Sequence, residues 1–365
     1  MRVRVLPATG ATLEVAGLPV AERTRRAFGR AGLEGLAGIA PDPGGDPASP
    51  LLLVAGDAWV EPAALRAIAG ADAPPEAALA IAGAEAAPAV LRVPPGAPLP
   101  TDAEGLALLA ADFRARGLLC EVSAGAARCQ RVRSPEEARS AGRALVAELV
   151  RESDGLFARH LDRKLSAPLS VWLVRHGVAP NAVTLLATAV GLAGAACLAS
   201  PGRAAQVLGA LLFVASTVLD GCDGEVARLA LRSSHFGHTL DLFCDNLVNA
   251  AVFLAVGIAC LRADTTGWLV AVVGAALAGL AFASAMGFAY AGWLERSGRL
   301  TSLRQAYERL ASRDFAYLLL ALAAAGRLVW FVWAAALGSW AFGGLLLALR
   351  LAEWPPSAPG EEVAP

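Results

Sequence analysis

The sequence predicts a chain of two parts, a soluble α/β domain followed by a polytopic α-helical membrane domain. Residues 1–165 carry mixed charge and frequent Pro and Gly, whereas residues 179–350 consist mainly of apolar runs. Several of these runs are long enough to cross the hydrocarbon core of a bilayer, which is about 30 Å thick. Over all 365 residues, 56% are apolar and only 17% are charged, as expected when a membrane domain dominates the composition.

The first part alternates segments typical of strands and helices. MRVRVL alternates in hydrophobicity like a strand, and LLLVA is a short apolar run typical of a buried strand. Ser134, Pro135 and Glu137 together are typical of a helix start, since Ser caps the first turn and Glu at the third position supports the cap. The expected elements are strands at 1–6 and 51–55, helices at 19–37 and 61–69, and a long helical connector from 134 to about 165.

The second part is expected to cross the membrane about six times. The predicted spans are 180–200, 204–229, 238–260, 267–292, 314–327 and 328–350, the last two separated only around Gly326 and Arg327. An amphipathic segment from Lys164 to His176 precedes them and is expected to lie at the membrane surface. The predicted domains are therefore 1–130 (soluble), 131–178 (connector and juxtamembrane helix), 179–352 (membrane) and 353–365 (disordered tail).

Arginine placement predicts the orientation in the membrane. If the N-terminal domain is cytoplasmic, most arginines near the spans fall on the cytoplasmic side, and the opposite side receives only Arg203, Arg262 and Arg327. This asymmetry follows the positive-inside rule. We therefore expect a multi-pass protein of the inner, cytoplasmic membrane, with its N-terminal domain and active site in the cytoplasm. The segment MRVRVLPATG lacks the apolar region of a signal peptide.

Charge and cysteine usage argue against two classes of function. The net charge of −1 gives no basic field, so a nucleic-acid partner is not expected. The six cysteines show no C-x-x-C spacing, and four of them fall in expected membrane helices. We interpret them as small apolar residues rather than as disulfides or zinc ligands.

Four aspartates interrupt the apolar second part: Asp220, Asp223, Asp241 and Asp245. An aspartate at the bilayer centre costs about 2.5–3.5 kcal/mol, so this group needs compensation. The spacings of three and four residues place each pair on one helix face. Two such helices can present four carboxylates to one point, the oxygen-rich site that Mg²⁺, Mn²⁺ or Ca²⁺ prefers. The residue types alone leave open a non-enzymatic, carboxylate-lined ion transporter and a polar seam between two helices.

The spacing of these aspartates resembles the signature of the CDP-alcohol phosphotransferases (CDP-alcohol phosphatidyltransferases), D-x2-D-G-x2-A-R-x8-G-x3-D-x3-D. Every specified position is present with the correct gaps. The upstream segment PNAVT, residues 180–184, is similar to the P-N-x-[IV]-T motif that precedes the family's first membrane helix. The matching signature positions are Asp220, Asp223, Gly224, Ala227, Arg228, Gly237, Asp241 and Asp245.

The resemblance implies a metal-dependent membrane enzyme. Such an enzyme transfers a substituted phosphate from a CDP-alcohol, here CDP-diacylglycerol or CDP-inositol, to an acceptor alcohol such as inositol phosphate, and it releases CMP. The activity belongs to phospholipid or inositol-phosphodiester biosynthesis. The resemblance also implies a two-metal site holding Mg²⁺ or Mn²⁺, contact with the lipid bilayer, and a homodimer.

The family pattern also assigns roles to residues of this sequence. It implies that Asp220, Asp223 and Asp241 are metal ligands, and that Asp245 is the general base and a fourth ligand. The expected nucleotide-binding residues are Gly224, Ala227, Arg228, Gly237, Asn181 and Thr184, and the candidates for an acceptor phosphate are Arg313 and Arg296. Two alternatives stay open, since Arg228 is also placed to snorkel at a helix end and the basic cluster around Arg313 also fits a purely topological role.

The first domain resembles a sugar-phosphate nucleotidyltransferase that has lost its catalytic parts. Gly17-Leu18-Pro19 and LLLVAGD are similar to that family's substrate turn and metal-binding aspartate, which would be Asp57. The glycine-rich G-x-G-x-R…P-K loop is missing and the domain has no lysine, so a triphosphate has little to hold it. We therefore expect Asp57 to be a turn residue at a strand end. The whole layout is similar to fused proteins that make CDP-inositol and then di-myo-inositol phosphate phosphate.

Overall fold

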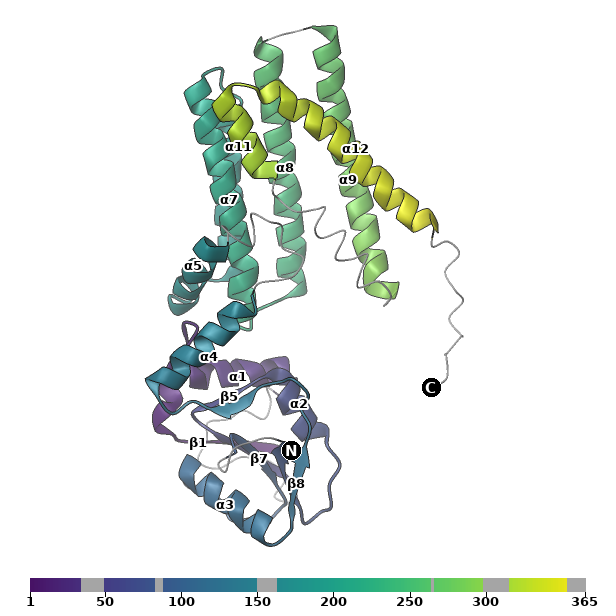
Figure 1. Ribbon diagram of the computed structural model, residues 1–365. Coiled ribbons are helices and arrows are strands. Elements are labelled where there is room, and N and C mark those ends of the chain that lie inside the picture. The colour runs from purple at the N-terminus through teal and green to yellow at the C-terminus, as the bar shows by residue number, and fades with distance from the viewer. Residues whose placement is uncertain (34–48, 83–87, 150–162, 264–265, 298–314, 353–365) are drawn as a thin grey trace. The chain divides into compact units, whose positions relative to one another are not determined.

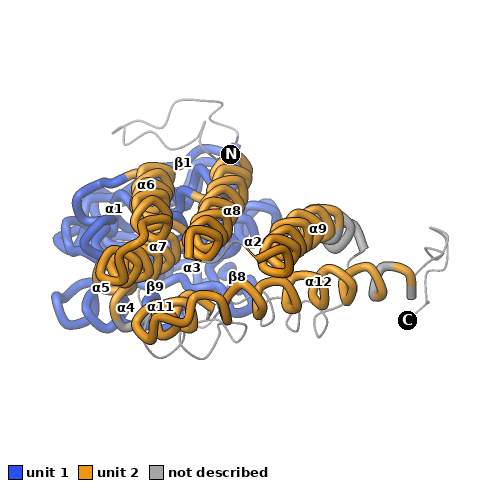
Figure 2. The backbone as a smooth tube through the Cα atoms, turned by 90° about the horizontal axis from the view of Figure 1, so that it is seen from above, with its two compact units in different colours: residues 1–149, 170–178, 226–232 blue, residues 150–169, 179–225, 233–365 orange. Residues whose placement is uncertain are grey.

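The computed structural model describes residues 1–33, 49–82, 88–149, 163–263, 266–297 and 315–352 (Figure 1). The chain separates into two compact units, coloured blue and orange in Figure 2. The first unit comprises residues 1–149, 170–178 and 226–232, and the second comprises residues 150–169, 179–225 and 233–365. An α/β region followed by a helical region with membrane-length helices confirms the predicted fold class.

A five-stranded mixed sheet forms the centre of the first unit. Its order is β1 (Arg2–Leu6), β4 (Leu51–Ala55), β7 (Val90–Val93), β6 (Ala78–Ile81) and β8 (Leu119–Val122). The pairs β1–β4 and β6–β8 are parallel, whereas β7 runs antiparallel to both β4 and β6. Every residue of β4 is buried, as expected for an apolar strand with neighbours on both sides. The strands predicted at 1–6 and 51–55 are confirmed.

Helices and two small sheets complete the first unit. Helices α1 (Val20–Arg30), α2 (Pro62–Gly70) and α3 (Ala103–Ala115) share one apolar core with the large sheet. One small sheet pairs β2 (Glu14–Val15) with β3 (Leu18–Pro19), and the other pairs β5 (Ala58–Val60) with β9 (Cys129–Arg131). A short 3-10 helix, η1 (Thr9–Thr12), follows β1. The predicted helix at 61–69 is confirmed, and the one at 19–37 is confirmed up to Arg30. The last residues of this second predicted helix, 34–37, lie outside the described residues.

Helix α4 (Pro135–Ala147) begins where the capping pattern predicts. The Glu137 backbone N–H donates to Ser134 Oγ at 3.1 Å, and the Glu137 carboxylate accepts from the Arg133 N–H at 2.7 Å. The first bond satisfies a donor that a helix start leaves without an intrahelical partner, and the second ties the residue before the N-cap to the same turn. The predicted continuation towards residue 165 lies largely outside the described residues. The chain is described again from α5 (Arg163–Arg175), which corresponds to the predicted juxtamembrane segment.

The second unit is helical, and five of the described helices are long and apolar enough to cross a membrane. They are α6 (Pro180–Leu198), α7 (Arg203–Leu229), α8 (His235–Ala263), α9 (Gly267–Ser297) and α12 (Leu328–Ala352). The predicted span at 314–327 corresponds to α11 (Phe315–Ala325), whose 11 described residues extend over about 17 Å. The residues directly before Phe315 lie outside the described ranges. The break between α11 and α12 lies at Gly326, as predicted, where φ is +69°.

Small residues let α6 pack closely against α7. A Cβ placed at Gly209 of α7 would lie 2.6 Å from the carbonyl oxygen of Gly194 on α6, so the two backbones meet where neither residue has a side chain. Further along, Ser216 of α7 donates to the carbonyl of Ala187 on α6 at 2.8 Å. Such small-residue contacts and interhelical hydrogen bonds are typical of helix pairs in membranes.

Helix α7 ends in a Schellman turn with an unusual residue. The N–H of Arg232 donates to the carbonyl of Ala227 at 2.8 Å, and the N–H of Leu231 to that of Arg228 at 3.2 Å. The left-handed position of this turn is usually glycine, but here Leu231 occupies it with φ of 53°. The Leu231 side chain packs against the apolar core of the first unit, and Arg26 of α1 donates to the carbonyl of Ala230 at 2.9 Å.

Candidate metal and nucleotide site

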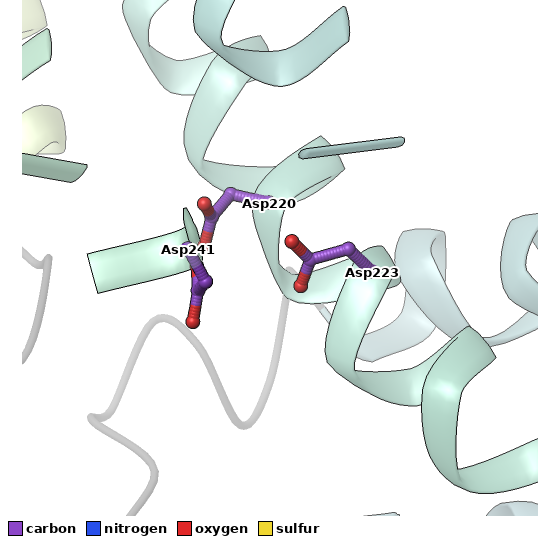
Figure 3. Close-up of side chains that lie close together, drawn as sticks. All are labelled: Asp220, Asp223 and Asp241. Atoms are coloured by element: carbon purple, nitrogen blue, oxygen red, sulfur yellow. The ribbon is translucent and has the colours of Figure 1, made fainter. Parts of the chain in front are cut away.

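Helices α7 and α8 bring three carboxylates together (Figure 3). Asp220 and Asp223 lie three residues apart on α7, and Asp241 extends from the first turns of α8. One oxygen from each lies within 4.8 Å of the others. Ligand oxygens on opposite sides of one ion are separated by about 4.2 Å around Mg²⁺ and about 4.8 Å around Ca²⁺, given the usual metal–oxygen distances. The group therefore has the spacing and the donor chemistry of a divalent-cation site.

The α7 carboxylates are removed from solvent and their orientation is fixed from α6. Asp220 is 9% exposed and Asp223 6% exposed. Thr184, which is 2% exposed on the first turn and a half of α6, donates its hydroxyl hydrogen to Asp223 Oδ2. The motif PNAVT thus contacts a candidate ligand directly. The sequence predicted that Thr184 binds nucleotide, and it did not predict this hydrogen bond to Asp223. The only signal in the sequence was the position of PNAVT before the aspartate helices.

The signature glycine on α8 lies where α6 and α8 come close together. A Cβ placed at Gly237 would lie 3.0 Å from Asn181 Oδ1 and 3.1 Å from Ser234 Oγ. The Gly237 N–H also donates to Ser234 Oγ at 3.0 Å, which caps the start of α8. Glycine therefore leaves room for the Asn181 amide beside the first turn of α8. The structure brings together Asn181 and Gly237, two residues predicted to bind nucleotide.

The remaining predicted residues lie nearby in sequence or outside the described side chains. Asp245 is partly buried one turn after Asp241 on α8, and it is not a member of the group of three. Gly224 follows Asp223 directly, and Ala227 and Arg228 lie in the last turn of α7. Arg296 lies near the end of α9, and Arg313 falls outside the described residues.

The first unit contains a buried aspartate in a different setting. Asp57 lies in the turn between β4 and β5 and is 1% exposed. Arg131 of β9 binds both of its oxygens, with Nε–Oδ1 at 2.8 Å and Nη2–Oδ2 at 2.9 Å, and also contacts Glu104 at 3.1 Å. Burial alone would lower the pKa of Arg131, but its hydrogen bonds with Asp57 raise the pKa above its ordinary value. This carboxylate is already neutralised by a cation of the chain.

The segment after β1 is packed tightly against this ion pair. A Cβ placed at Gly10 would lie 2.1 Å from the Val132 carbonyl oxygen and 2.9 Å from Asp57 Cβ. Backbone therefore fills the space beside Asp57, and Gly10 is required for the close approach.

The fold and the site together define a multi-pass membrane protein with a carboxylate cluster between two of its apolar helices. The sequence model of the CDP-alcohol phosphatidyltransferase family matches residues 177–341, which include PNAVT and all four aspartates. Residues 177–341 therefore carry a CDP-alcohol phosphatidyltransferase domain.

Similar proteins match parts of the chain. It is 40% identical over 126 residues to the bifunctional IPC transferase and DIPP synthase of Archaeoglobus fulgidus. The matched segment covers 34% of this chain and 24% of that protein. It is 32% identical over 114 residues to the phosphatidylinositol phosphate synthase of Streptomyces avermitilis. That matched segment covers 31% of this chain and 46% of that protein. The chain thus spans about a quarter of the first relative and less than half of the second.

Among solved structures, the chain is similar to the phosphatidylinositol phosphate synthase of Mycobacterium tuberculosis crystallised with CDP-DAG bound. The sequence identity is 22% and the TM-score is 0.40, and the match covers 55% of this chain and 100% of that one.

Proposed function

We propose that the protein is an integral membrane CDP-alcohol phosphotransferase that transfers a substituted phosphate from a CDP-alcohol to an acceptor alcohol and releases CMP. One observation carries the proposal: three carboxylates from α7 and α8 lie within 4.8 Å of one another, inside the region that matches the family. Carboxylates at this separation repel one another, and a divalent cation bound among them would offset that repulsion.

In the proposed reaction, the hydroxyl oxygen of the acceptor attacks the phosphorus that bears the donor alcohol. The bond from this phosphorus to the bridging oxygen breaks, and CMP leaves with that oxygen. Asp245, one turn from Asp241 and on the same face of α8, accepts the hydroxyl proton. Two Mg²⁺ or Mn²⁺ ions held by the four aspartates would neutralise the phosphates and stabilise the leaving oxygen when bound.

The surrounding residues are proposed to hold the nucleotide and the acceptor. Gly237 and Asn181 form a crowded wall at the starts of α6 and α8, suited to close contact with the cytidine, with Gly224, Ala227 and Arg228 completing the nucleotide site. The relatives named above support an inositol-phosphate acceptor and a donor such as CDP-diacylglycerol or CDP-inositol. We further propose a homodimer in the cytoplasmic membrane with this site facing the cytoplasm and with Arg296 and Arg313 near the acceptor phosphate.

For the first unit we propose a nucleotidyltransferase-like domain that does not catalyse nucleotidyl transfer. Its support is the bidentate Arg131 contact on Asp57 and the packing of Gly10 against both Asp57 and Val132. We expect the full chain to release no pyrophosphate from CTP and inositol phosphate. Steady pyrophosphate release that disappears in Asp57→Asn would contradict this assignment.

The activity is tested by CMP release from the purified full chain in detergent or nanodiscs. Each reaction contains Mg²⁺ or Mn²⁺, inositol phosphate, and either CDP-diacylglycerol or CDP-inositol, so that the preferred donor distinguishes a lipid from a soluble product. We expect metal-dependent CMP release with one donor. Asp245→Asn should abolish turnover while CDP-alcohol binding stays detectable, because it removes the base and leaves the other three carboxylates.

Asp112→Asn, on the exposed surface of α3, is the matched control and should release CMP at the wild-type rate. Wild-type turnover in Asp245→Asn would refute the role of that residue. No CMP release from any donor, in protein that binds Mn²⁺, would favour a carboxylate-lined transporter instead.

A further inference from the structure

Helix α7 has a second buried polar contact, on the side facing α5. Ser166 of α5 donates its hydroxyl hydrogen to Glu225 Oε1 of α7 at 2.7 Å. Ser166 is 2% exposed and Glu225 is fully buried. Neither residue is specified by the family signature, in which position 225 is one of the two free positions before Ala227. A buried carboxylate among apolar helices is costly, and its presence here calls for a physical reason.

The contact lies opposite the carboxylate cluster around the α7 axis. At 100° per residue, Asp220 and Asp223 point to one side of the helix, and Cys222 and Glu225 point to nearly the opposite side. Cys222 is fully buried, and its Sγ lies 3.8 Å from the carbonyl oxygen of Ser166. Both the side chain and the backbone of Ser166 therefore contact this second face of α7.

This arrangement makes the rotation of α7 sensitive to α5. The close packing of Gly194 and Gly209 and the Ser216 hydrogen bond hold the first part of α7 against α6, whereas the Ser166 contact lies near the aspartates. A hydrogen bond to a carboxylate is directional and contributes about 1.5–3 kcal/mol. Turning α7 so that Asp220 and Asp223 leave Asp241 would break the bond from Ser166 and leave the Glu225 oxygen without this donor. Catalytic groups misplaced by about 1 Å lose on the order of a hundredfold in rate.

We propose that the Ser166–Glu225 hydrogen bond fixes the rotation of α7 and thereby holds Asp220 and Asp223 in position for metal binding. Ser166 and Glu225 are positioning residues, since they act on the site through the backbone of α7. This inference rests on the proposed function of the aspartate cluster. It adds two residues to the machinery that the aspartate spacing alone does not identify.

The test measures Mn²⁺ binding to the full chain by electron paramagnetic resonance, together with CMP release and the metal-free midpoint of thermal unfolding. Ser166→Ala is expected to raise the Kd for Mn²⁺ about tenfold, the equivalent of losing one such hydrogen bond, and to lower kcat with little change in KM for the CDP-alcohol. Glu225→Gln keeps an acceptor oxygen of the same shape and should stay within about threefold of wild type.

Ser339→Ala is the matched control, because Ser339 donates at 2.6 Å to Ala335 within its own helix, α12. It should leave the Kd for Mn²⁺ unchanged. If Ser166→Ala does not fold, Ser166→Cys replaces it with a weaker donor of similar size and should move the Kd in the same direction.

The outcomes separate the two proposals. No Mn²⁺ binding by the wild type would overturn the proposed function together with the positioning role. Wild-type binding combined with an unchanged Kd in the folded Ser166 variant would overturn the positioning role alone. A tenfold weaker Kd in both Ser166→Ala and Ser339→Ala would also overturn it, since the effect would then follow from any lost buried hydroxyl.

Discussion

The two units treat buried aspartates in opposite ways. In the first unit, Asp57 receives both hydrogen bonds of an arginine fork, and the backbone around Gly10 closes the space beside it. In the second unit, Asp220, Asp223 and Asp241 crowd together within 4.8 Å. An arginine supplied by the chain makes the first arrangement complete without a ligand. For the three carboxylates of the second unit, we propose that a metal ion from solution binds among them and offsets their mutual repulsion.

The difference shows how burial alone fails to identify a functional carboxylate. Asp57, at 1% exposure, is more buried than Asp220 or Asp223. What separates them is the number of carboxylates at one point. Asp57 is a single carboxylate held by an arginine fork, whereas three carboxylates lie within 4.8 Å of one another in the second unit. The variants expected to have the largest effects therefore each remove one carboxylate, one variant from each unit.

Asp223→Ala should have the largest effect on activity. It removes a proposed ligand, so CMP release should fall at least about 10³-fold and metal-dependent CDP-alcohol binding should be lost. The metal-free thermal midpoint should stay the same or rise, because one source of repulsion is gone. Turnover assays and thermal unfolding with and without Mn²⁺ check this. A lower metal-free midpoint would mean that the cluster stabilises the fold as Asp57 does.

Asp57→Ala should have the largest effect on stability. It leaves the Arg131 guanidinium buried without its main partner, which costs about 3–5 kcal/mol. Hydrogen exchange of peptides from β5 and β9 should accelerate, while CMP release by the remaining folded protein is preserved. The double variant Asp57→Leu/Arg131→Met should recover most of the protection. Exposed Asp112, paired with Arg116 at 3.3 Å, is the control, since Asp112→Ala should cost less than about 1 kcal/mol.

Thr184→Ala should have an intermediate effect, confined to the second unit. Loss of the hydroxyl that donates to Asp223 should weaken Mn²⁺ binding by about fivefold to tenfold. Thr184→Ser keeps the donor and should bind Mn²⁺ nearly as well as the wild type. Equal weakening in both variants would assign the effect to packing of the threonine methyl group.

The smallest expected effect concerns Cys129, and it tests whether reagents in solution reach the interior beside Arg131. Burial raises the pKa of the Cys129 thiol from 9.0 to about 12. Because the native state favours the neutral thiol, this group's contribution to stability is present below pH 9 and is lost as the pH rises towards 12. Alkylation at pH 8.5, followed by mass spectrometry, should be much slower at Cys129 in native than in denatured protein. Equal rates would indicate an open cleft there.

Local patterns predicted much of this architecture. The α4 cap, the strands at 1–6 and 51–55 and five membrane helices follow from spacings within a few residues, which the backbone geometry of helices and strands dictates. The convergence of Asp220, Asp223 and Asp241 also follows from spacing, once two helices are joined by a short loop. The roles assigned to the individual site residues stay predictions.

Contacts between distant segments could not be predicted in the same way. Arg131 is 74 residues from Asp57, and Ser166 is 59 residues from Glu225. Both pairings depend on tertiary packing, which no local pattern encodes. Residues 315–349 form one apolar stretch, so hydropathy alone does not show where one helix ends and the next begins. Gly326, with a φ of +69°, marks the break between α11 and α12.

The turn that joins the two aspartate helices has a consequence for shortened versions of this protein. A leucine in the left-handed conformation costs about 1–2 kcal/mol relative to ordinary backbone, and at Leu231 this cost is offset by the apolar surface that its side chain covers in the α/β unit. A truncated chain without residues 1–149 would keep the backbone penalty and lose the compensating surface. Glycine at position 231 is therefore the replacement that a minimal, membrane-only derivative would need to keep the corner between α7 and α8 intact.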